Sequence, residues 1–280
     1  MTSLRPLIAS AWMGIQHDLS WTTPPAALVL RTVAPFASAM TVSIIYWFAA
    51  TQTHFPIDPI RLSFILVGST LYAHVASYAW VPTIAIAEGK NLSVFPHIYL
   101  TSRSTAGYVA GRAFSSFAIS TTTSLAALTI AVFAIGALAG AQVNIIVTPA
   151  SVAMLFVALI VNIPAALGLG YFLGAYSLYA SKFEWSLPGY VAGLLMVFSG
   201  ALFPTSTLPY PVSTVASYLP FTMFIQAARE ALIPNQPGEY LVSLSICALG
   251  GAILLVSGLK VYFASERRAR RDGVIDRRLA

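Results

Sequence analysis

Six long apolar stretches constrain the fold of this chain more than any other feature of its sequence. An α-helix needs about 20 mostly apolar residues to cross the hydrocarbon core of a bilayer. Five of the stretches reach this length, and the fifth along the chain lies at the lower edge of the range. The pattern predicts an all-α integral membrane protein, one membrane domain over residues 1–280, with six transmembrane helices at residues 29–50, 62–84, 109–138, 150–178, 188–203 and 240–264.

The composition supports a membrane protein over a soluble one. The chain is 58% hydrophobic and only 9% charged, whereas soluble domains carry roughly 25% charged residues. Cys247 is the single cysteine and lies in an apolar stretch, so the sequence contains no disulfide pair and no cysteine spacing typical of a metal site. We read no cleavable signal peptide at the N-terminus.

Lysine and arginine side chains set the expected orientation. Seven of the 15 lie in the last 21 positions, mostly in a basic tail at residues 265–280. Lys90 and Arg103 follow the second span, Lys182 follows the fourth, and the connection after the third has no charge. The pattern predicts a plasma or inner membrane protein with both termini in the cytosol. We interpret the basic tail as a contact for anionic membrane lipids and expect no nucleic-acid partner.

Residues 1–25 precede the first span and read as an amphipathic helix lying in the membrane interface. Trp12 and Trp21 suit the headgroup level. The apolar positions repeat at helical spacing: Leu4, Leu7, Ile8, Ala11, Ile15 and Leu19.

Several kinds of active site are missing from the sequence. A nucleotide-binding loop reads GxxxxGK[ST], but Gly89-Lys90 is preceded by Ile84 at the first glycine position and followed by Asn91. No HExxH is present. We therefore expect the chain not to be an enzyme and to bind no cofactor or metal. His74 is the one ionisable candidate near the centre of a span, which argues against an ion-coupled carrier.

The cytosolic connection at residues 85–105 contains a short amphipathic segment. A helix between Asn91 and Leu100 would turn Leu92, Phe95 and Tyr99 to one side. Such a helix could dock on a soluble partner or lie on the bilayer, and its periodicity favours neither.

A proline-rich run, LFPTSTLPYPVSTVASYLP, follows the fifth span. Prolines block helix continuation, and the apolar piece that follows has about 12 residues, or about 18 Å of helix, which is too short to cross. Phe221, Phe224, Ile225, Ala228 and Leu232 share one face of that piece, and Thr222, Gln226, Arg229 and Glu230 lie elsewhere. We predict a re-entrant hairpin on the extracellular side at residues 204–239.

Two of these segments resemble the permease subunit of ABC-2 type transporters. Residues 88–95 read EGK-x-Leu-x-x-Phe after the second span, although Gly89-Lys90-Asn91-Leu92 departs from the Gly-Thr-Leu-like stretch of the family. The family pattern G-x-LFP, LP, LP, small-x-x-Arg is matched by Gly200, Leu202-Phe203-Pro204, Leu208-Pro209, Leu219-Pro220 and Ala228-Arg229.

The resemblance implies a complex of two permease subunits, identical or homologous, with two separate ABC ATPase subunits that hold ATP and Mg. It implies three sets of functional residues. The ATPase-coupling set is Glu88, Gly89, Lys90, Leu92, Phe95, Tyr99 and Leu100. The substrate path includes His74, Tyr78, Phe198 and Phe203, and the extracellular gate includes Pro204, Pro209, Tyr210, Tyr218 and Pro220.

The leading hypothesis is therefore the permease of an ATP-driven exporter for an amphipathic, lipid-like or drug-like substrate. The alternative is a stand-alone secondary transporter or channel. An intramembrane enzyme would need catalytic groups that the sequence lacks. For the polar stripe of the second span, Thr70, His74, Ser77 and Tyr78, two interpretations stay open: contact with substrate, or hydrogen bonds between helices.

Overall fold

The computed structural model describes residues 5–91, 94–101, 104–140, 143–179, 186–234 and 239–273, and every regular element within these ranges is a helix. The elements are α1 (Arg5–Leu19), α2 (Pro24–Gln52), α3 (Pro59–Asn91), α4 (Val94–Thr101), α5 (Ala106–Ala139), α6 (Pro149–Tyr179), α7 (Leu187–Phe198), η1 (Thr205–Thr207), α8 (Val212–Ser217), α9 (Pro220–Leu232) and α10 (Tyr240–Asp272). The all-α prediction is confirmed.

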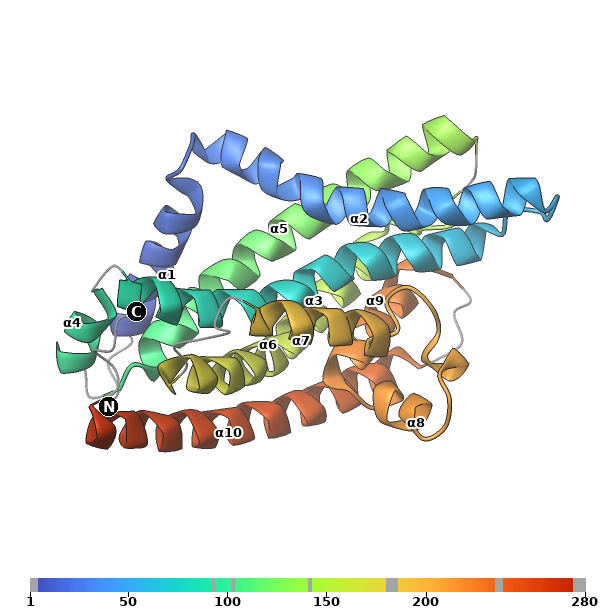
Figure 1. The fold of residues 1–280 in the computed structure, drawn as a ribbon. Coiled ribbons are helices and arrows are strands. Elements are labelled where there is room, and N and C mark those ends of the chain that lie inside the picture. Colours follow the sequence, from blue (N-terminus) through green and yellow to red (C-terminus); the bar gives the residue numbers. More distant parts are fainter. Residues whose placement is uncertain are drawn as a thin grey trace.

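Five long helices, α2, α3, α5, α6 and α10, form the body of the molecule (Figure 1). Each is long and apolar enough to cross a membrane, because helices of this size extend about 45–50 Å against a hydrocarbon core of roughly 30 Å. The chain is thus a multi-pass membrane protein. The fifth apolar stretch forms only the 12-residue helix α7, which extends about 18 Å, so the count of six spans is not confirmed.

Proline and glycine mark many of the helix boundaries. Pro24, Pro59 and Pro149 open α2, α3 and α6, where a proline costs no hydrogen bond because the first N–H groups of a helix have no partner inside it. Gly140 and Gly273 follow α5 and α10 with φ of 56° and 62°, the left-handed conformation that ends helices.

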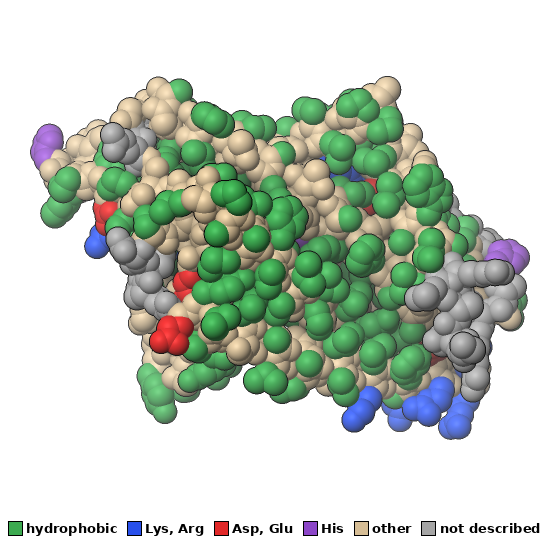
Figure 2. All heavy atoms as spheres, turned by 180° about the vertical axis from the view of Figure 1, so that it is seen from behind, with side chains coloured by type: hydrophobic (Ala, Val, Ile, Leu, Met, Phe, Trp, Pro, Cys, Tyr) green, Lys and Arg blue, Asp and Glu red, His purple; other side chains and the backbone are tan. Residues whose placement is uncertain are grey.

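The outer surface of the long helices is apolar. Ile45, Phe133 and Ile253 are 62%, 74% and 70% exposed, and hydrophobic side chains are spread over the middle of the face in Figure 2. Basic side chains gather instead at one edge of that view, where α10 ends. An apolar surface of this size is stable in lipid and not in water.

The two ends of the bundle differ. Figure 1 shows α1, α4, the start of α5 and the last turns of α10 together at one end, which we call the basic end. The η1–α8 segment lies at the opposite end, which we call the distal end. The first and last described helices thus meet at the same end, as the charge pattern predicts, although the cytosolic assignment itself stays a prediction.

Helix α1 packs on α5 through a stripe that its hydropathy does not reveal. Among the side chains of α1 that the structure describes, the buried ones belong to Ser10 and Asp18, and the backbone at Gly14 is buried as well. The Ser10 hydroxyl donates to the Gly107 carbonyl at 3.2 Å, and a Cβ on Gly14 would lie 2.1 Å from Ser115 Oγ. Of the predicted apolar face, Ile8 is 62% exposed. The membrane-interface position of this helix stays a prediction.

Helices α6 and α10 pack along much of their length, and small residues set how closely they approach. A Cβ on Gly258 of α10 would lie 2.4 Å from the Gly168 carbonyl oxygen of α6. Close contact of this kind replaces the hydrophobic effect as the force that holds helices together in lipid.

Helix α9 lies inside the bundle. It starts beside Gly250 of α10, where Pro220 lies within 3.6 Å of the position of a glycine Cβ. Its last residue accepts a 2.8 Å hydrogen bond from the Ile146 N–H at the α5–α6 connection. Thr222 and Arg229, which the pattern placed off the apolar face, are also buried, so most of the helix surface is covered. The residues of the predicted apolar face are all buried: Phe221, Phe224, Ile225, Ala228 and Leu232.

Candidate functional site

The last turn of α3 forms the first part of the predicted coupling region. Glu88, Gly89 and Lys90 continue this helix and do not lie in a loop. Glu88 pairs with His17 of α1, with 3.2 Å between Oε2 and Nε2. The Lys90 ammonium donates to the Ser177 and Leu178 carbonyls in the last turn of α6, where a cation also complements the helix dipole. The end of α3 is thereby fastened to both α1 and α6.

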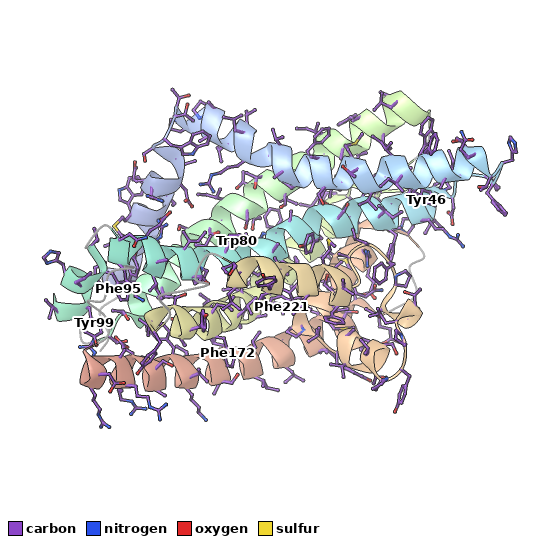
Figure 3. The ribbon with its side chains drawn as sticks, in the orientation of Figure 1. Tyr46, Trp80, Phe95, Tyr99, Phe172 and Phe221 are labelled. Atoms are coloured by element: carbon purple, nitrogen blue, oxygen red, sulfur yellow. The ribbon has the colours of Figure 1, made fainter. Side chains whose placement is uncertain are left out.

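The short helix α4 is the second part of this region. Phe95 is completely buried, and its ring centroid lies 6.1 Å from that of Tyr108. The Arg270 guanidinium lies 4.1 Å above the Tyr99 ring. Burial raises the pKa of the Tyr99 hydroxyl, so the ring is neutral and its face attracts a cation. Figure 3 shows both rings at the basic end.

The outer side of α4 is apolar and accessible. Leu100 is 80% exposed and Val94 is 41% exposed. Leu92, the remaining predicted coupling residue, lies outside the described residues. The arrangement is a short helix that is held from one side and presents an aliphatic tip on the other.

Glu266 on α10 links this region together, although no motif or periodicity in the sequence points to it. It is 3% exposed, and its carboxylate accepts from the Thr105 N–H at 2.8 Å and from the Ser104 hydroxyl at 2.7 Å. Arg270, which covers Tyr99, also donates to it at 3.0 Å. The carboxylate therefore supplies a hydrogen-bond acceptor at the start of α5, where the first backbone N–H groups have no partner within the helix.

Replacing Glu266 with alanine is expected to loosen the first turn of α5 while the long helices stay folded. The Thr105 amide should exchange with deuterium about tenfold faster, because a hydrogen bond to a charged group stabilises by about 1.5–3 kcal/mol. Hydrogen-exchange mass spectrometry of the purified protein measures this. Glu266→Gln keeps an acceptor oxygen, so its Thr105 amide should exchange at a rate between those of the other two proteins. Equal exchange in all three proteins would contradict this role.

A chain of polar side chains crosses the centre of the bundle. Asn162 of α6 donates to the Tyr78 hydroxyl at 3.2 Å, and Tyr78 is hydrogen-bonded to His74 Nε2. His74 Nδ1 lies 2.8 Å from Ser120 Oγ of α5, which donates to the Phe117 carbonyl. With Tyr78 as donor, His74 carries its proton on Nδ1, and both ring nitrogens are used inside one subunit.

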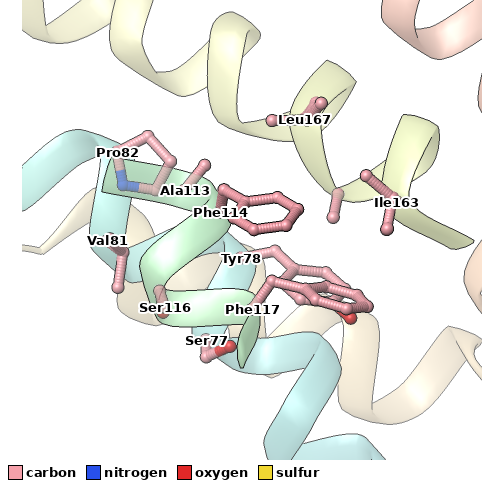
Figure 4. A pocket seen from close by; sticks show the side chains of 11 residues that line it. Ser77, Tyr78, Val81, Pro82, Ala113, Phe114, Ser116, Phe117, Ile163 and Leu167 are labelled. Carbon is pink, nitrogen blue, oxygen red and sulfur yellow. The ribbon is translucent and has the colours of Figure 1, made fainter. Parts of the chain in front are cut away.

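The surroundings of this chain are tightly filled. The adjoining cavity, between α3, α5 and α6, has a volume of about 10 Å³, about enough for one water molecule. Figure 4 shows the Tyr78, Phe114 and Phe117 rings around it. His74 and Tyr78 therefore connect helices, and the cavity beside Tyr78 is too small to hold a substrate. The Thr70 and Ser77 hydroxyls bond within α3 itself.

At the distal end, Arg229 of α9 holds the break that follows α7. Gly200 has φ of 65° and turns the chain out of the helix. The Arg229 guanidinium donates to the Gly200 and Ala201 carbonyls at 2.8 and 2.7 Å and to the Phe64 carbonyl of α3 at 3.2 Å. It also lies 3.3 Å from the Phe64 ring centroid. Arg229 is only 2% exposed, although its position in the sequence predicts that it lies off the apolar face of α9.

A cleft of about 670 Å³ opens beside this guanidinium. Phe203 and Pro204 line it, and the predicted path residue Phe198 accepts a hydrogen bond from Thr222 at its edge. The other predicted gate residues do not line it. Pro209, Tyr210 and Tyr218 are exposed around α8, and Pro220 is buried at the start of α9.

No protein-family model matches the chain, and no curated protein sequence is similar to it.

Proposed function

We propose that the chain is the permease subunit of an ATP-driven ABC-2 type exporter and works with a second permease and two separate ATPase subunits. The observation that carries the proposal is α4, a helix outside the long spans that is anchored from within and presents Leu100 outward. Part of a permease that transmits force from an ATPase needs both properties, a docking surface and a rigid connection to the spans.

The rigid connection is supplied by the contacts around α4. Phe95 is buried beneath the helix, Arg270 covers Tyr99, and Glu266 ties the same arginine to the start of α5. A displacement of α4 would therefore be felt by α5 and α10 together. ATP would favour one conformation of the complex through its higher affinity for the closed ATPase pair.

In this proposal the basic end faces the cytosol, since exposed Lys and Arg side chains at the end of α10 suit the positive-inside rule. Helix α1 lies along the interface, and α7 with the residues after it makes the fifth crossing. Helix α9 is the inner limb of a re-entrant hairpin, because backbone that bends at membrane depth must be buried in protein or line a cavity.

Photo-crosslinking from α4 tests the docking surface. A benzoylphenylalanine at position 100, activated in cells, should attach to a protein that contains a GxxxxGK[ST] loop. Leu100→Asp should reduce the amount of that ATPase that co-purifies by about tenfold, because a buried aliphatic anchor contributes about 1.5 kcal/mol or more.

Val215→Asp is the matched control, since Val215 is 66% exposed on α8 at the distal end and should leave ATPase binding unchanged. Cross-links that never include an ATPase would refute the proposal. Proteoliposomes containing the chain alone decide the alternative: cargo movement driven by an ion gradient without ATP would establish a secondary transporter.

A further inference from the structure

The distal cleft contains hydrogen-bond donors that have no partner among the described residues. Ser199 lines the cleft and is completely buried, and its hydroxyl has no partner among the described residues. Arg229 carries five N–H groups, and its four bonds to carbonyls leave one Nη1–H over. Buried donors are nearly always satisfied in proteins, so the two groups call for an acceptor that comes from outside the chain.

The charge of the cleft favours a negatively charged acceptor. Arg61 and Asp58 line it and pair with each other at 3.4 Å. The hydrogen-bond partners of Arg229 among the described residues are all backbone carbonyls, with no carboxylate among them. Glu230, the next residue on α9, is bonded to Gln226 and Ser243. The charged residues that line the cleft therefore leave one positive charge unbalanced.

The size and walls of the cleft indicate what kind of molecule carries this negative group. The volume of about 670 Å³ lies within the range of about 300–1,000 Å³ that is typical of small-molecule sites. Phe64, Ile65, Leu202 and Phe203 give it apolar walls beside the polar floor. Such a combination matches an amphiphile with a short anionic head and a hydrocarbon body.

We propose that this cleft binds the carboxylate or phosphate head of an amphipathic molecule, with Ser199 and Arg229 as donors and Arg61 at the rim. The claim that this molecule is the transported cargo rests on the proposed function. The binding does not, because every residue that makes the site belongs to this chain.

Calorimetric titration of the full chain in phosphatidylcholine nanodiscs tests the site, with empty nanodiscs correcting for partition into lipid. Dodecyl phosphate should bind at least tenfold more tightly than dodecyltrimethylammonium, which has the same tail and the opposite charge. Ser199→Ala should weaken dodecyl phosphate binding about tenfold, as expected for a lost hydrogen bond to an anion. It should leave the unfolding temperature unchanged, because the hydroxyl has no bond to lose. Ser213→Ala on α8 is the control.

The source of the anionic head can be separated in the same assay. If a membrane lipid is the natural occupant, phosphatidylglycerol in the nanodisc should compete with dodecyl phosphate. If a free amphiphile is the natural occupant, phosphatidylglycerol should not change the affinity for dodecyl phosphate. Equal affinities for the two dodecyl compounds, or unchanged affinity in Ser199→Ala, would overturn the site. ATP-driven transport is measured separately, so anion binding without transport would count against the proposed function alone.

Discussion

Arg229→Met is expected to lower the thermal unfolding temperature by roughly 5 °C or more, corresponding to about 3 kcal/mol. The substitution leaves the Gly200 and Ala201 carbonyls without their donors and removes the additional bond to the Phe64 carbonyl of α3. Each unsatisfied buried group costs about 1–3 kcal/mol, which outweighs the gain from removing a buried charge. Thermal unfolding followed by intrinsic fluorescence in detergent micelles measures the difference.

Two further variants make the Arg229 experiment specific. Arg61→Met removes an arginine from the same cleft whose side chain is 77% exposed, and it should change the unfolding temperature by little. Arg229→Lys keeps the charge, but an ammonium group cannot reach several carbonyls as one planar guanidinium does. Its unfolding temperature should therefore lie between those of the unchanged protein and Arg229→Met. An unfolding temperature for Arg229→Met equal to that of Arg61→Met would show that the guanidinium does not hold the break.

Gly258→Leu is expected to separate α6 from α10 and to remove most of the monodisperse protein. Even a Cβ at this position would meet the Gly168 carbonyl oxygen at 2.4 Å, and that oxygen belongs to the backbone of α6, which cannot move aside as a side chain can. Overpacking costs about 1–3 kcal/mol where a core can adjust, and a backbone contact adjusts least. Size-exclusion chromatography and the unfolding temperature measure the loss.

Gly136→Leu is the matched control for this substitution. Gly136 lies in the long helix α5, and a Cβ built there has no neighbour within 4 Å. The same leucine in an equally apolar helix should therefore be tolerated. If both leucine variants behaved alike, the close approach of α6 and α10 would not be important for folding.

The sequence predicted those parts of the fold that leave a periodic apolar signal. Hydropathy and helical spacing predict the five long helices α2, α3, α5, α6 and α10. They also predict the burial of the apolar residues of α9. The fifth apolar stretch was predicted too long, because the prediction extended to Phe203 and α7 ends at Phe198. Gly200 explains the difference, since its positive φ ends the helix before the prolines begin.

The rest of the candidate site depends on contacts that leave no local signal. Ser10 and Gly14 carry almost no hydropathy, so a stripe of such residues cannot be recognised before α5 is placed against it. Arg229 and Glu266 look like solvent-facing charges in the sequence. Each is buried because it bonds to groups far away along the chain: Arg229 to the Phe64 carbonyl, Glu266 to the Thr105 amide.

The depth of α9 in the bundle also determines the order in which the chain can be assembled. The walls around this helix include α10, which is synthesised after it, and Pro220 rests against Gly250. With 13 residues, α9 is too short to enter the membrane as a spanning segment of its own. Its contacts with α10 can form only after that later helix has been synthesised, so we expect this part of the distal end to reach its final packing late in biogenesis.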